Sequence, residues 1–471
     1  NALENFYEAT GVGKNLVLVF LEGLETVYME ESIFPGLTPN LNALNVQGWQ
    51  LNNLKQIEGT GWTMGGIVAT LCGTPLIYES SLGGNNIMFT RFLDKAACLP
   101  DILRQADYQQ VFMGGASLEF AGKGDFLKQH GFDQVLGRAA LRRQLPDASY
   151  LGAWGLFDDS LFALALQQYR RLAAEGKPFN LTLLTVDTHH PGGEPSSSCS
   201  PYAEIDNSIL HAVHCTDYLV GNFIEQLKQH PAYEDTVVVM LSDHLALRNN
   251  AFSLFPKDYE RHLYFSVLNS DHQASSQVLA TPMDLAPTIL EMLDITHDAS
   301  FLVGIDLLDA DVQRSDRNID DPRWENIIRY INSNYLTTTE NEVLYSLNRA
   351  NWDEIDFVND VENVEFSQNG VKFNATGNDP YFILPELRSF QQKDFRIYIT
   401  IDVEQASAMA LYYLTDEDKG YSETNKLTRE TEAGTNQLVF SLNRRAGQGR
   451  LRIDPGLNPG KYFIRSLEIR S

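Results

Sequence analysis

Four positions far apart in the chain carry side chains that together would bind a metal ion and activate an oxygen nucleophile. They are Glu22, Thr63 and the adjacent pair Asp243 and His244. Carboxylate oxygens and imidazole nitrogens are ligands of divalent cations, and a threonine hydroxyl is a weak nucleophile unless a metal or a base lowers its pKa. If the fold brings these side chains together, they predict metal-dependent phosphoryl or sulfuryl transfer.

Three of these residues follow segments that predict buried strands. Glu22 comes directly after the apolar run at 15–21, and Asp243 with His244 follows the apolar run at 237–241. Open α/β sheets bind their ligands at the carboxyl ends of their strands, so we expect these side chains at one edge of a sheet. Taken alone, Glu22 is also consistent with a solvated glutamate or a helix cap. Asp243 and His244 are also consistent with a loop aspartate followed by a histidine that packs without binding a metal.

Thr63 lies in a glycine-rich segment, EGTGWTMGG at 58–66, at the expected start of a helix. Glycines let a backbone approach a ligand closely, and the free N–H groups of a helix start attract phosphate. The alternative is an ordinary N-cap threonine.

His189 and His190 follow another apolar run, at 181–186, in the segment TVDTHHP. Either imidazole is suited to holding a substrate oxygen or to protonating a leaving alkoxide. Structural packing is the alternative, above all for His190.

Strand and helix patterns alternate over the first three hundred residues. Helical patterns separate continuous apolar runs, which are typical of strands buried on both faces of a parallel sheet. This alternation predicts the α/β class, with a doubly wound, mostly parallel sheet over residues 1–310. The runs lie at 15–21, 110–113, 181–186, 237–241 and, more weakly, 264–268, and the helical patterns at 63–71, 99–106, 160–174, 208–228 and 282–293.

The pattern changes beyond residue 310. We expect a charged connector over 311–345, with one amphipathic piece at 324–335, and a β-sandwich domain over 346–471. Asn369-Gly370 is a hairpin signal between two of the alternating segments. Tyr412, Tyr413 and Tyr421 would suit sugar stacking if exposed, although core packing is the commoner role. The alternating segments lie at 364–367, 371–373, 395–403, 408–413, 437–442, 450–453 and 461–469.

Composition narrows the classes of function. The 471 residues include 36 Lys+Arg and 62 Asp+Glu, a net charge of −26 that repels nucleic acid, so no nucleic-acid partner is expected. No segment approaches the roughly 18 apolar residues of a membrane span. The first residues form no signal peptide and contain no initiator Met, so we expect a trimmed piece whose membrane anchor, if any, lies upstream.

Four cysteines, at 72, 98, 199 and 215, form no Cys-x-x-Cys pair, which argues against a zinc knuckle. The simplest pairing is Cys72 with Cys98 and Cys199 with Cys215, among the three pairings that four cysteines allow. Four buried thiols in a cytosolic protein are the alternative.

Seven segments together resemble the phosphoglycerol transferase I family, which modifies osmoregulated periplasmic glucans. That family is related to lipoteichoic acid synthase within the sulfatase/alkaline phosphatase superfamily. The segments occur in the family's order and spacing, over roughly residues 15–300. They are NLVLVFLEGLETVY, FPGLTPNLNAL, EGTGWTMGGIVATLCGTPL, FAGKGDFLKQHGFD, WGLFDDSLF, LTVDTHHP and DTVVVMLSDHLAL.

The resemblance implies one divalent cation, manganese, bound by the residues at Glu22, Asp243 and His244, with Thr63 as nucleophile and fourth ligand. It implies that Thr63 carries a glycerophosphoryl group between two half-reactions. His189 matches a substrate-binding histidine of the lipoteichoic acid branch.

The acceptor side of the site departs from that branch. Lys123 stands where the branch has a phosphate-gripping arginine, and a lysine supplies a point charge in place of a bidentate fork. The branch's tryptophan and histidine positions fall on Ala121 and on Gly114 or Gly115. His190 is a further candidate for contacts with sugar or glycerol hydroxyls, and so are three residues of a shared motif. For the two aspartates among them, the alternative is a carboxylate that stabilises the start of a helix. The three residues of the motif are Trp154, Asp158 and Asp159.

The function that the resemblance implies is transfer of phosphoglycerol from a lipid such as phosphatidylglycerol to a periplasmic glucan. Hydrolytic release of phosphoglycerol by a phosphodiesterase is the nearest alternative, and a catalytically inactive glycan-binding module is another. A sulfatase is disfavoured because that class makes its nucleophile from Cys or Ser in a Cys/Ser-x-Pro/Ala-x-Arg setting. The resemblance also implies a periplasmic domain of an inner-membrane protein, near the membrane through a segment outside this chain, which favours two disulfides.

Overall fold

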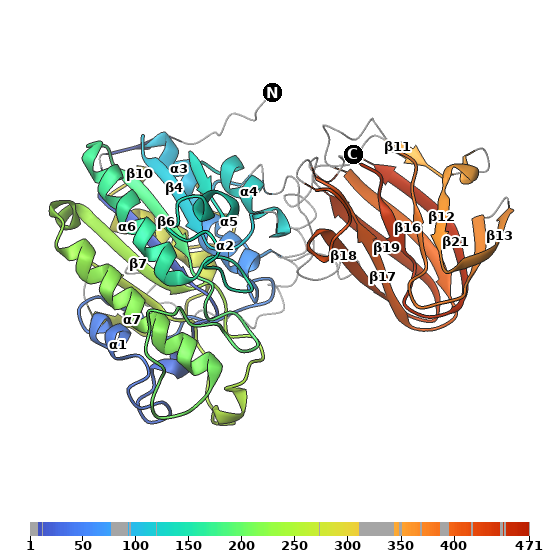
Figure 1. Ribbon diagram of the computed structural model, residues 1–471. Helices are drawn as coiled ribbons and strands as arrows, with labels where there is room; N and C mark the ends of the chain where they lie inside the picture. The colour runs from blue at the N-terminus through green and yellow to red at the C-terminus, as the bar shows by residue number, and fades with distance from the viewer. Residues whose placement is uncertain are drawn as a thin grey trace. The chain divides into compact units, whose positions relative to one another are not determined.

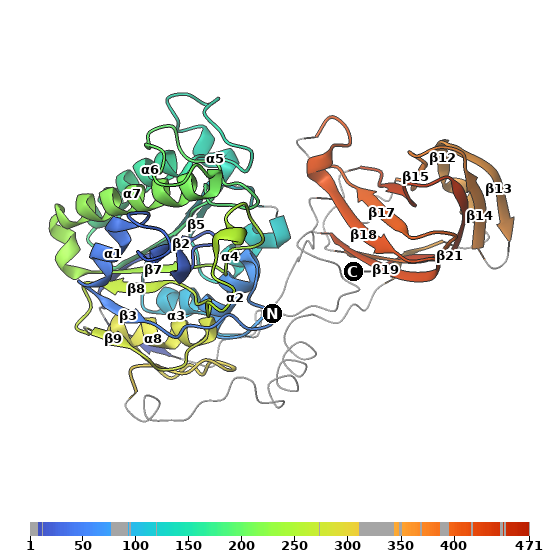
Figure 2. The same cartoon turned by 90° about the horizontal axis from the view of Figure 1, so that it is seen from below.

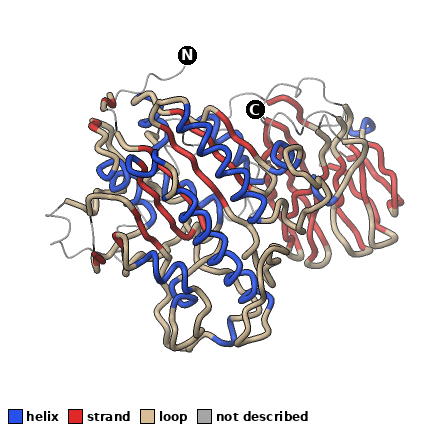
Figure 3. The backbone as a smooth tube through the Cα atoms, turned by 60° about the vertical axis from the view of Figure 1, so that its left-hand side comes forward, coloured by secondary structure: helices blue, strands red, loops and turns tan. Residues whose placement is uncertain are grey.

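The computed structural model describes residues 8–309 and 343–470, apart from 12, 77–92, 94–95, 119, 273, 348–350, 368–369, 387–394, 416–417, 443–445 and 447–448. They form two compact units, one α/β and the other made mostly of strands, as Figure 3 shows. Most of the predicted connector, including its amphipathic piece at 324–335, lies outside the described residues.

The first unit is built around one mixed, mostly parallel sheet (Figure 1). Its strands β5, β4, β6, β2 and β7 run parallel to one another, and β8 pairs antiparallel to β7. The sheet order is β5 (Gln134–Leu136), β4 (Gln109–Gly114), β6 (Phe179–Leu184), β2 (Asn15–Leu21), β7 (Thr236–Ser242), β8 (Phe265–Leu268), β3 (Trp49–Leu51) and β9 (Ala274–Ser276).

The predicted α/β class is therefore confirmed, and the five apolar runs are strands. Strands β2 and β7 lie at the centre of the sheet, and every residue from Leu16 to Leu21 and from Thr236 to Ser242 is buried. Burial on both faces explains why these strands are continuous in apolar character and do not alternate. The three-residue strands β3, β5 and β9 were not predicted. A short pair, β1 (Ala9–Thr10) with β10 (Thr296–His297), lies apart from the sheet.

Helices cover both faces of this sheet, as a doubly wound fold requires. Helices α1, α6 and α7 pack together on one face, whereas α2, α3 and α8 pack together on the other (Figure 2). The helices are α1 (Pro39–Asn45), α2 (Thr63–Cys72), α3 (Leu99–Gln105), α4 (Lys123–Gln129), α5 (Arg138–Arg142), α6 (Asp158–Ala174), α7 (Ser208–Lys228) and α8 (Leu285–Met292).

The second unit consists of two antiparallel sheets whose apolar faces share one core. The predicted hairpin is present, because β13 pairs antiparallel with β14 and Ser367 faces Gly370 across the pair. One sheet contains β11 (Val343–Ser346), β13 (Val361–Ser367), β14 (Gly370–Ala375), β16 (Phe395–Val403), β19 (Gly434–Leu442) and β21 (Gly460–Arg470). The other contains β12 (Asp356–Asn359), β15 (Tyr381–Ile383), β17 (Ser407–Tyr412), β18 (Lys426–Thr431) and β20 (Arg452–Asp454).

The tyrosines suggested for sugar stacking on this unit do not form an exposed platform. Tyr412 and Tyr413 are buried, and Tyr413 belongs to the shared core. The hydroxyl of Tyr421 donates to the carbonyl oxygen of Arg450. The commoner role, packing, holds for the two buried rings.

Both predicted disulfides are present. Cys72 at the end of α2 is bonded to Cys98 just before α3, and Cys199 is bonded to Cys215 within α7. Disulfides of this kind persist in oxidising compartments. Among the described residues, no helix has both the length and the apolar character that crossing a bilayer requires.

Replacing both Cys199 and Cys215 by serine is expected to lower the free energy of unfolding by about 3 kcal/mol, because this bond closes a loop of 16 residues. Urea denaturation of the variant and the parent protein measures the difference. Equal midpoints and slopes would show that the bond contributes no stability.

Candidate metal and nucleophile site

Glu22 and Asp243 leave the carboxyl ends of two neighbouring parallel strands. Leu21 of β2 lies opposite Ser242 of β7 in the register, so the next residue of each strand reaches the same point on the sheet edge. This placement follows from the strands being adjacent and in register, which brings together residues more than two hundred positions apart.

The structure gathers all four candidate residues at this edge. Nε2 of His244 lies 3.4 Å from Oε1 of Glu22 and 3.4 Å from Oδ2 of Asp243. The hydroxyl of Thr63 lies 3.5 Å from Oε2 of Glu22. One ligand atom from each of Glu22, Asp243 and His244 lies within 4.8 Å of the others, a spacing suited to a shared cation.

Hydrogen bonds fix which atoms face the centre of the cluster. Oδ1 of Asp243 accepts from the backbone N–H of Gly23 and of His244, whereas Oδ2 is buried and has no hydrogen-bond partner in the described part of the chain. Nδ1 of His244 donates to the carbonyl oxygen of Leu245, which turns Nε2 toward the two carboxylates. An orphaned carboxylate oxygen beside an oriented imidazole is the arrangement expected of metal ligands.

The charges of the cluster are strongly coupled. Burial raises the pKa of Asp243 to about 7, and the charge of Glu22 adds to this rise. Burial opposes ionisation of Glu22 as well, but the charge and hydrogen bond of His244 outweigh it and hold the pKa of Glu22 at about 2. Against its own burial, the imidazole of His244 is held protonated by the two carboxylates, with a pKa of about 10. Protons thus neutralise a buried anionic site that a hard divalent cation would fit.

Thr63 is the first residue of α2, and Trp62 is the N-cap, so the alternative of an ordinary N-cap threonine is wrong. A side chain at Gly66 would overlap the carbonyl oxygen of Asp243, and its absence lets the start of α2 pack directly on the Asp243 loop. The glycine therefore allows two parts of the protein to approach each other, and this contact brings the Thr63 hydroxyl to the carboxylates.

The loop after β6 holds the main chain of Glu22. The hydroxyl of Thr185 accepts from the N–H of Glu22 at 3.0 Å, and the hydroxyl of Thr188 donates to the Glu22 carbonyl oxygen at 2.5 Å. Neither threonine was singled out in the sequence, although both lie in the segment TVDTHHP. They place His189 on the same rim as the candidate metal ligands.

His189, His190 and Trp154 form a stack of three rings. The ring centroids of Trp154 and His189 lie 3.9 Å apart, and those of His189 and His190 lie 4.7 Å apart. Nδ1 of His189 donates to the carbonyl oxygen of His190, so Nε2 is the nitrogen available to a substrate. Partial burial and the charge of His189 lower the pKa of His190, which favours its neutral form.

Asp158 and Asp159 do not present free carboxylates to a substrate. Asp158 is fully buried, and its two oxygens accept from the backbone N–H groups of Val186 and Asp187. Asp187 in turn accepts from the N–H of Asp158 and from Ser196. Asp159 accepts from the hydroxyl of Tyr150 and from neighbouring serines. These contacts make the two predicted substrate-binding aspartates positioning residues that join α6 to the loop carrying His189.

The buried pair Asp158 and Asp187 predicts a specific pH dependence of stability. Burial raises the pKa of Asp187 from 3.8 to about 7, so between these values the folded protein holds a proton that the unfolded chain releases. Stability therefore falls as pH rises through this window, by at most about 1.4 kcal/mol per pH unit for one proton. Asp187→Asn is expected to make the urea midpoint less dependent on pH across this window. An unchanged dependence would show that Asp187 titrates normally.

A partly buried ion pair joins the two loops that carry the candidate metal ligands. The Arg261 guanidinium donates to both carboxylate oxygens of Glu25, at 2.6 and 2.5 Å, and to the carbonyl oxygen of Ala246. Glu25 follows Glu22 on the β2 loop, and Ala246 follows His244 on the β7 loop. Neither Glu25 nor Arg261 was singled out in the sequence.

Lys123 is the first residue of α4, and its side chain is buried. Its predicted role, as a cation for the phosphate, remains a prediction.

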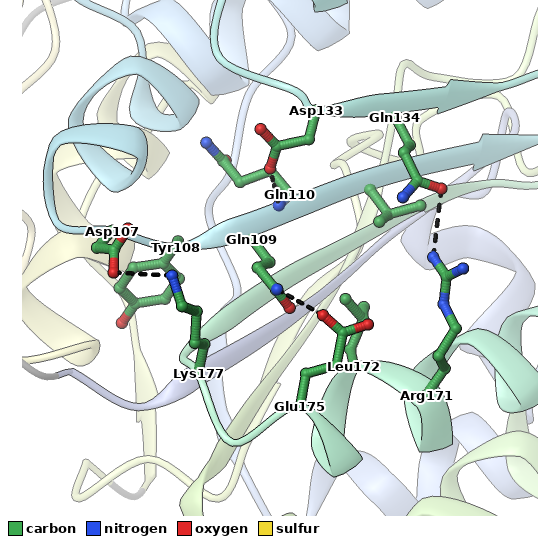
Figure 4. A pocket seen from close by; sticks show the side chains of 11 residues that line it. Asp107, Tyr108, Gln109, Gln110, Asp133, Gln134, Arg171, Leu172, Glu175 and Lys177 are labelled. Carbon is green, nitrogen blue, oxygen red and sulfur yellow. Dashed lines mark hydrogen bonds and ion pairs between the residues drawn. The ribbon is translucent and has the colours of Figure 1, made fainter.

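A polar pocket of about 290 Å³ lies at the opposite edge of the sheet (Figure 4). It is lined by residues at the amino ends of β4 and β5 and at the end of α6. Its charged groups are paired: Lys177 contacts Asp107, and Glu175 accepts from Gln109. Because the metal cluster lies at the carboxyl ends of the strands, this pocket is separate from the site.

Comparison with known proteins agrees with this geometry. The family model described as Sulfatase matches residues 14–295. Phosphoglycerol transferase I of Salmonella arizonae is 38% identical over 285 residues, which make up 59% of this chain and 37% of that protein. The protein of the same name from Salmonella paratyphi B gives the same figures. The match thus spans little more than a third of the length of these relatives.

Two solved structures share the fold. A protein of the alkaline phosphatase superfamily from Vibrio parahaemolyticus has a TM-score of 0.52 and 20% identity, covering 81% of each chain. The lipoteichoic acid synthase LtaP from Listeria monocytogenes has a TM-score of 0.50 and 19% identity, covering 62% of this chain and 75% of its own.

Proposed function

Because the chain belongs to the sulfatase family, we propose that its four clustered side chains form the active site of a metal-dependent phosphoglycerol transferase. The relatives named phosphoglycerol transferase I support this reaction over sulfate-ester hydrolysis. The observation that carries the proposal is the position of the Thr63 hydroxyl beside Glu22, in a cluster where Oδ2 of Asp243 lacks a hydrogen bond within the described residues and Nε2 of His244 faces both carboxylates.

Glu22, Asp243, His244 and Thr63 would hold one divalent cation, for which we propose manganese. Such an ion, when bound, lowers the pKa of a coordinated hydroxyl and withdraws charge from phosphoryl oxygens. The position of Thr63 at the start of α2 adds the free N–H groups and positive end of a helix dipole, which favour an anionic group.

In the first half-reaction, the ionised Oγ1 of Thr63, which has released its proton to solvent, attacks the phosphorus of a phosphatidylglycerol-type donor. The new bond joins Thr63 to phosphorus, and the bond from phosphorus to the diacylglycerol oxygen breaks. His189 is suited to give the leaving oxygen a proton from Nε2, because its Nδ1 is engaged with the His190 carbonyl oxygen.

In the second half-reaction, a glucan hydroxyl attacks the same phosphorus and the bond to Thr63 breaks, which regenerates the ionised Oγ1. His189, neutral after the first step, accepts the proton of the incoming hydroxyl. Water in place of the glucan would turn the same cycle into phosphodiester hydrolysis.

Incubating the full chain with manganese, phosphatidylglycerol and an unmodified β-glucan tests the proposal. Transfer predicts diacylglycerol and phosphoglycerol bound to the glucan, in equal amounts. Free phosphoglycerol, formed equally with and without glucan, would instead identify a phosphodiesterase. No release of diacylglycerol under either condition would contradict the proposed donor.

The two disulfides also support a location in an oxidising compartment, for which we propose the periplasm.

A further inference from the structure

Trp154 is a large apolar side chain that remains 47% exposed beside the proposed active site. One side of its ring system lies against His189, with the ring centroids 3.9 Å apart. Exposed indoles that lie next to reactive groups commonly contact ligands, because they offer a rigid apolar face and one N–H donor.

The loop that carries Trp154 is held in place by main-chain contacts. The N–H of Gly152 donates to the carbonyl oxygen of Gly155, and the N–H of Leu156 donates to that of Gly115. Gly155 has a φ of 151°, and a Cβ there would overlap the Gly115 carbonyl oxygen, so this turn requires glycine. The indole is therefore presented in a fixed position before any ligand binds.

Glu194 connects this loop to the loop of the catalytic histidine. Its Oε2 accepts from the N–H of Ala153 at 2.7 Å, and its own N–H donates to the carbonyl oxygen of Asp187 at 2.7 Å. Within the described residues, nothing donates to Oε1. A carboxylate with spare accepting capacity is thus held against the main chain of the residue before Trp154. The same residue is tied by its N–H to Asp187, two positions before His189.

We propose that Trp154 and Glu194 form a sugar subsite for the acceptor. The outer face of the indole stacks on the C–H face of a pyranose ring, and Glu194 accepts a hydrogen bond from a hydroxyl of the same sugar. The neighbouring sugar then presents its hydroxyl to His189 and to the phosphorus on Thr63. This subsite rests on the proposed function, since it specifies how that reaction selects its acceptor.

The surroundings favour a sugar over a lipid surface. Tryptophan also occurs at membrane interfaces, but there its partners are typically Lys and Arg, whereas here a carboxylate accepts from the N–H of the preceding residue, Ala153.

The test measures binding without turnover, in the Thr63→Ala background, with a β-linked gluco-oligosaccharide as the probe and calorimetry as the readout. Adding Trp154→Ala is expected to weaken binding about tenfold. Trp154→Phe should retain most of the affinity, because a flat ring remains above His189. Tyr218→Ala, which removes an aromatic ring of similar exposure (48%) from α7, should leave affinity unchanged.

Equal affinity of the parent and Trp154→Ala proteins would overturn the subsite. The subsite would also be overturned if Trp154→Ala lost binding to phosphatidylglycerol vesicles while its oligosaccharide affinity stayed unchanged, because Trp154 would then contact lipid. If Trp154→Ala fails to fold, Glu194→Gln serves in its place, since the amide oxygen still accepts from Ala153. It should bind the oligosaccharide more weakly than the parent does, and equal affinity would count against the subsite. Absence of transfer by the wild-type protein would refute the proposed function while leaving these binding results interpretable.

Discussion

Thr63→Ala is expected to reduce phosphoglycerol transfer by on the order of 10⁴-fold or more, the usual scale for loss of a catalytic nucleophile. The hydroxyl lies 3.5 Å from Glu22 and makes no capping hydrogen bond to α2. Its removal therefore takes away the attacking oxygen while leaving the helix and the three other ligands in place. Release of diacylglycerol from labelled phosphatidylglycerol measures the rate.

Two controls separate this effect from loss of the metal or of the fold. Thr63→Ser keeps a hydroxyl at the start of α2 and should retain measurable turnover. Thr63→Ala protein should still take up manganese when assayed by elemental analysis, because Glu22, Asp243 and His244 remain. Activity of Thr63→Ala within about tenfold of the parent would exclude the covalent route.

Asp243→Asn is expected to abolish metal binding and transfer without unfolding the protein. The amide oxygen can still accept from Gly23 and His244, as Oδ1 does now. The new NH₂ group occupies the place of Oδ2, which has no hydrogen-bond partner in the described part of the chain, and an amide nitrogen cannot bind a cation. Affinity for manganese should therefore fall by more than about 100-fold, which exceeds the cost of losing a contact that supports a ligand. Manganese titration of the metal-free protein measures this loss.

Asp243→Asn is expected to lose metal binding but not to lose stability in the absence of metal. In the metal-free protein, burial raises the pKa of Asp243 to about 7, so above that pH a buried charge destabilises the fold. Asp243→Asn removes that charge and should unfold at an equal or higher urea concentration near pH 8, without metal. The parent protein, unlike the variant, should gain stability when manganese is added.

The matched control is Asp217→Asn. Asp217 is also buried, and it accepts main-chain hydrogen bonds from Asn40 and Leu41 at the start of α1. It should lose stability and keep manganese affinity. If Asp217→Asn and Asp243→Asn lowered manganese affinity alike, the cluster would not be a specific metal site.

The sequence predicted those helices and strands whose pattern of apolar and polar residues is visible within the element itself. Strands β2 and β7 are continuous apolar runs because both of their faces are buried, and α7 carries an amphipathic pattern over its full length. The strands β3, β5 and β9 were missed because three residues are too few to show a recognisable pattern of apolar and polar positions. Their strand conformation comes from pairing, of β3 with β8, of β9 with β3 and of β5 with β4, which the sequence does not display.

The same distinction applies to the site. Glu22, Asp243 and His244 were identifiable because each follows a buried strand. Asp158 was misassigned because its partners, Val186 and Asp187, come from another loop and are found only in three dimensions. The roles of Glu194 and Arg261 likewise depend on contacts between loops, and no motif marks them.

Intact-protein and peptide mass spectrometry, after brief exposure of the manganese-loaded protein to phosphatidylglycerol without acceptor, tests the central claim most directly. The account predicts one added glycerophosphoryl group, located on the peptide that contains Thr63 and lost when glucan is supplied. Diacylglycerol release with no adduct on Thr63 at any time, or an adduct on another residue, would contradict it.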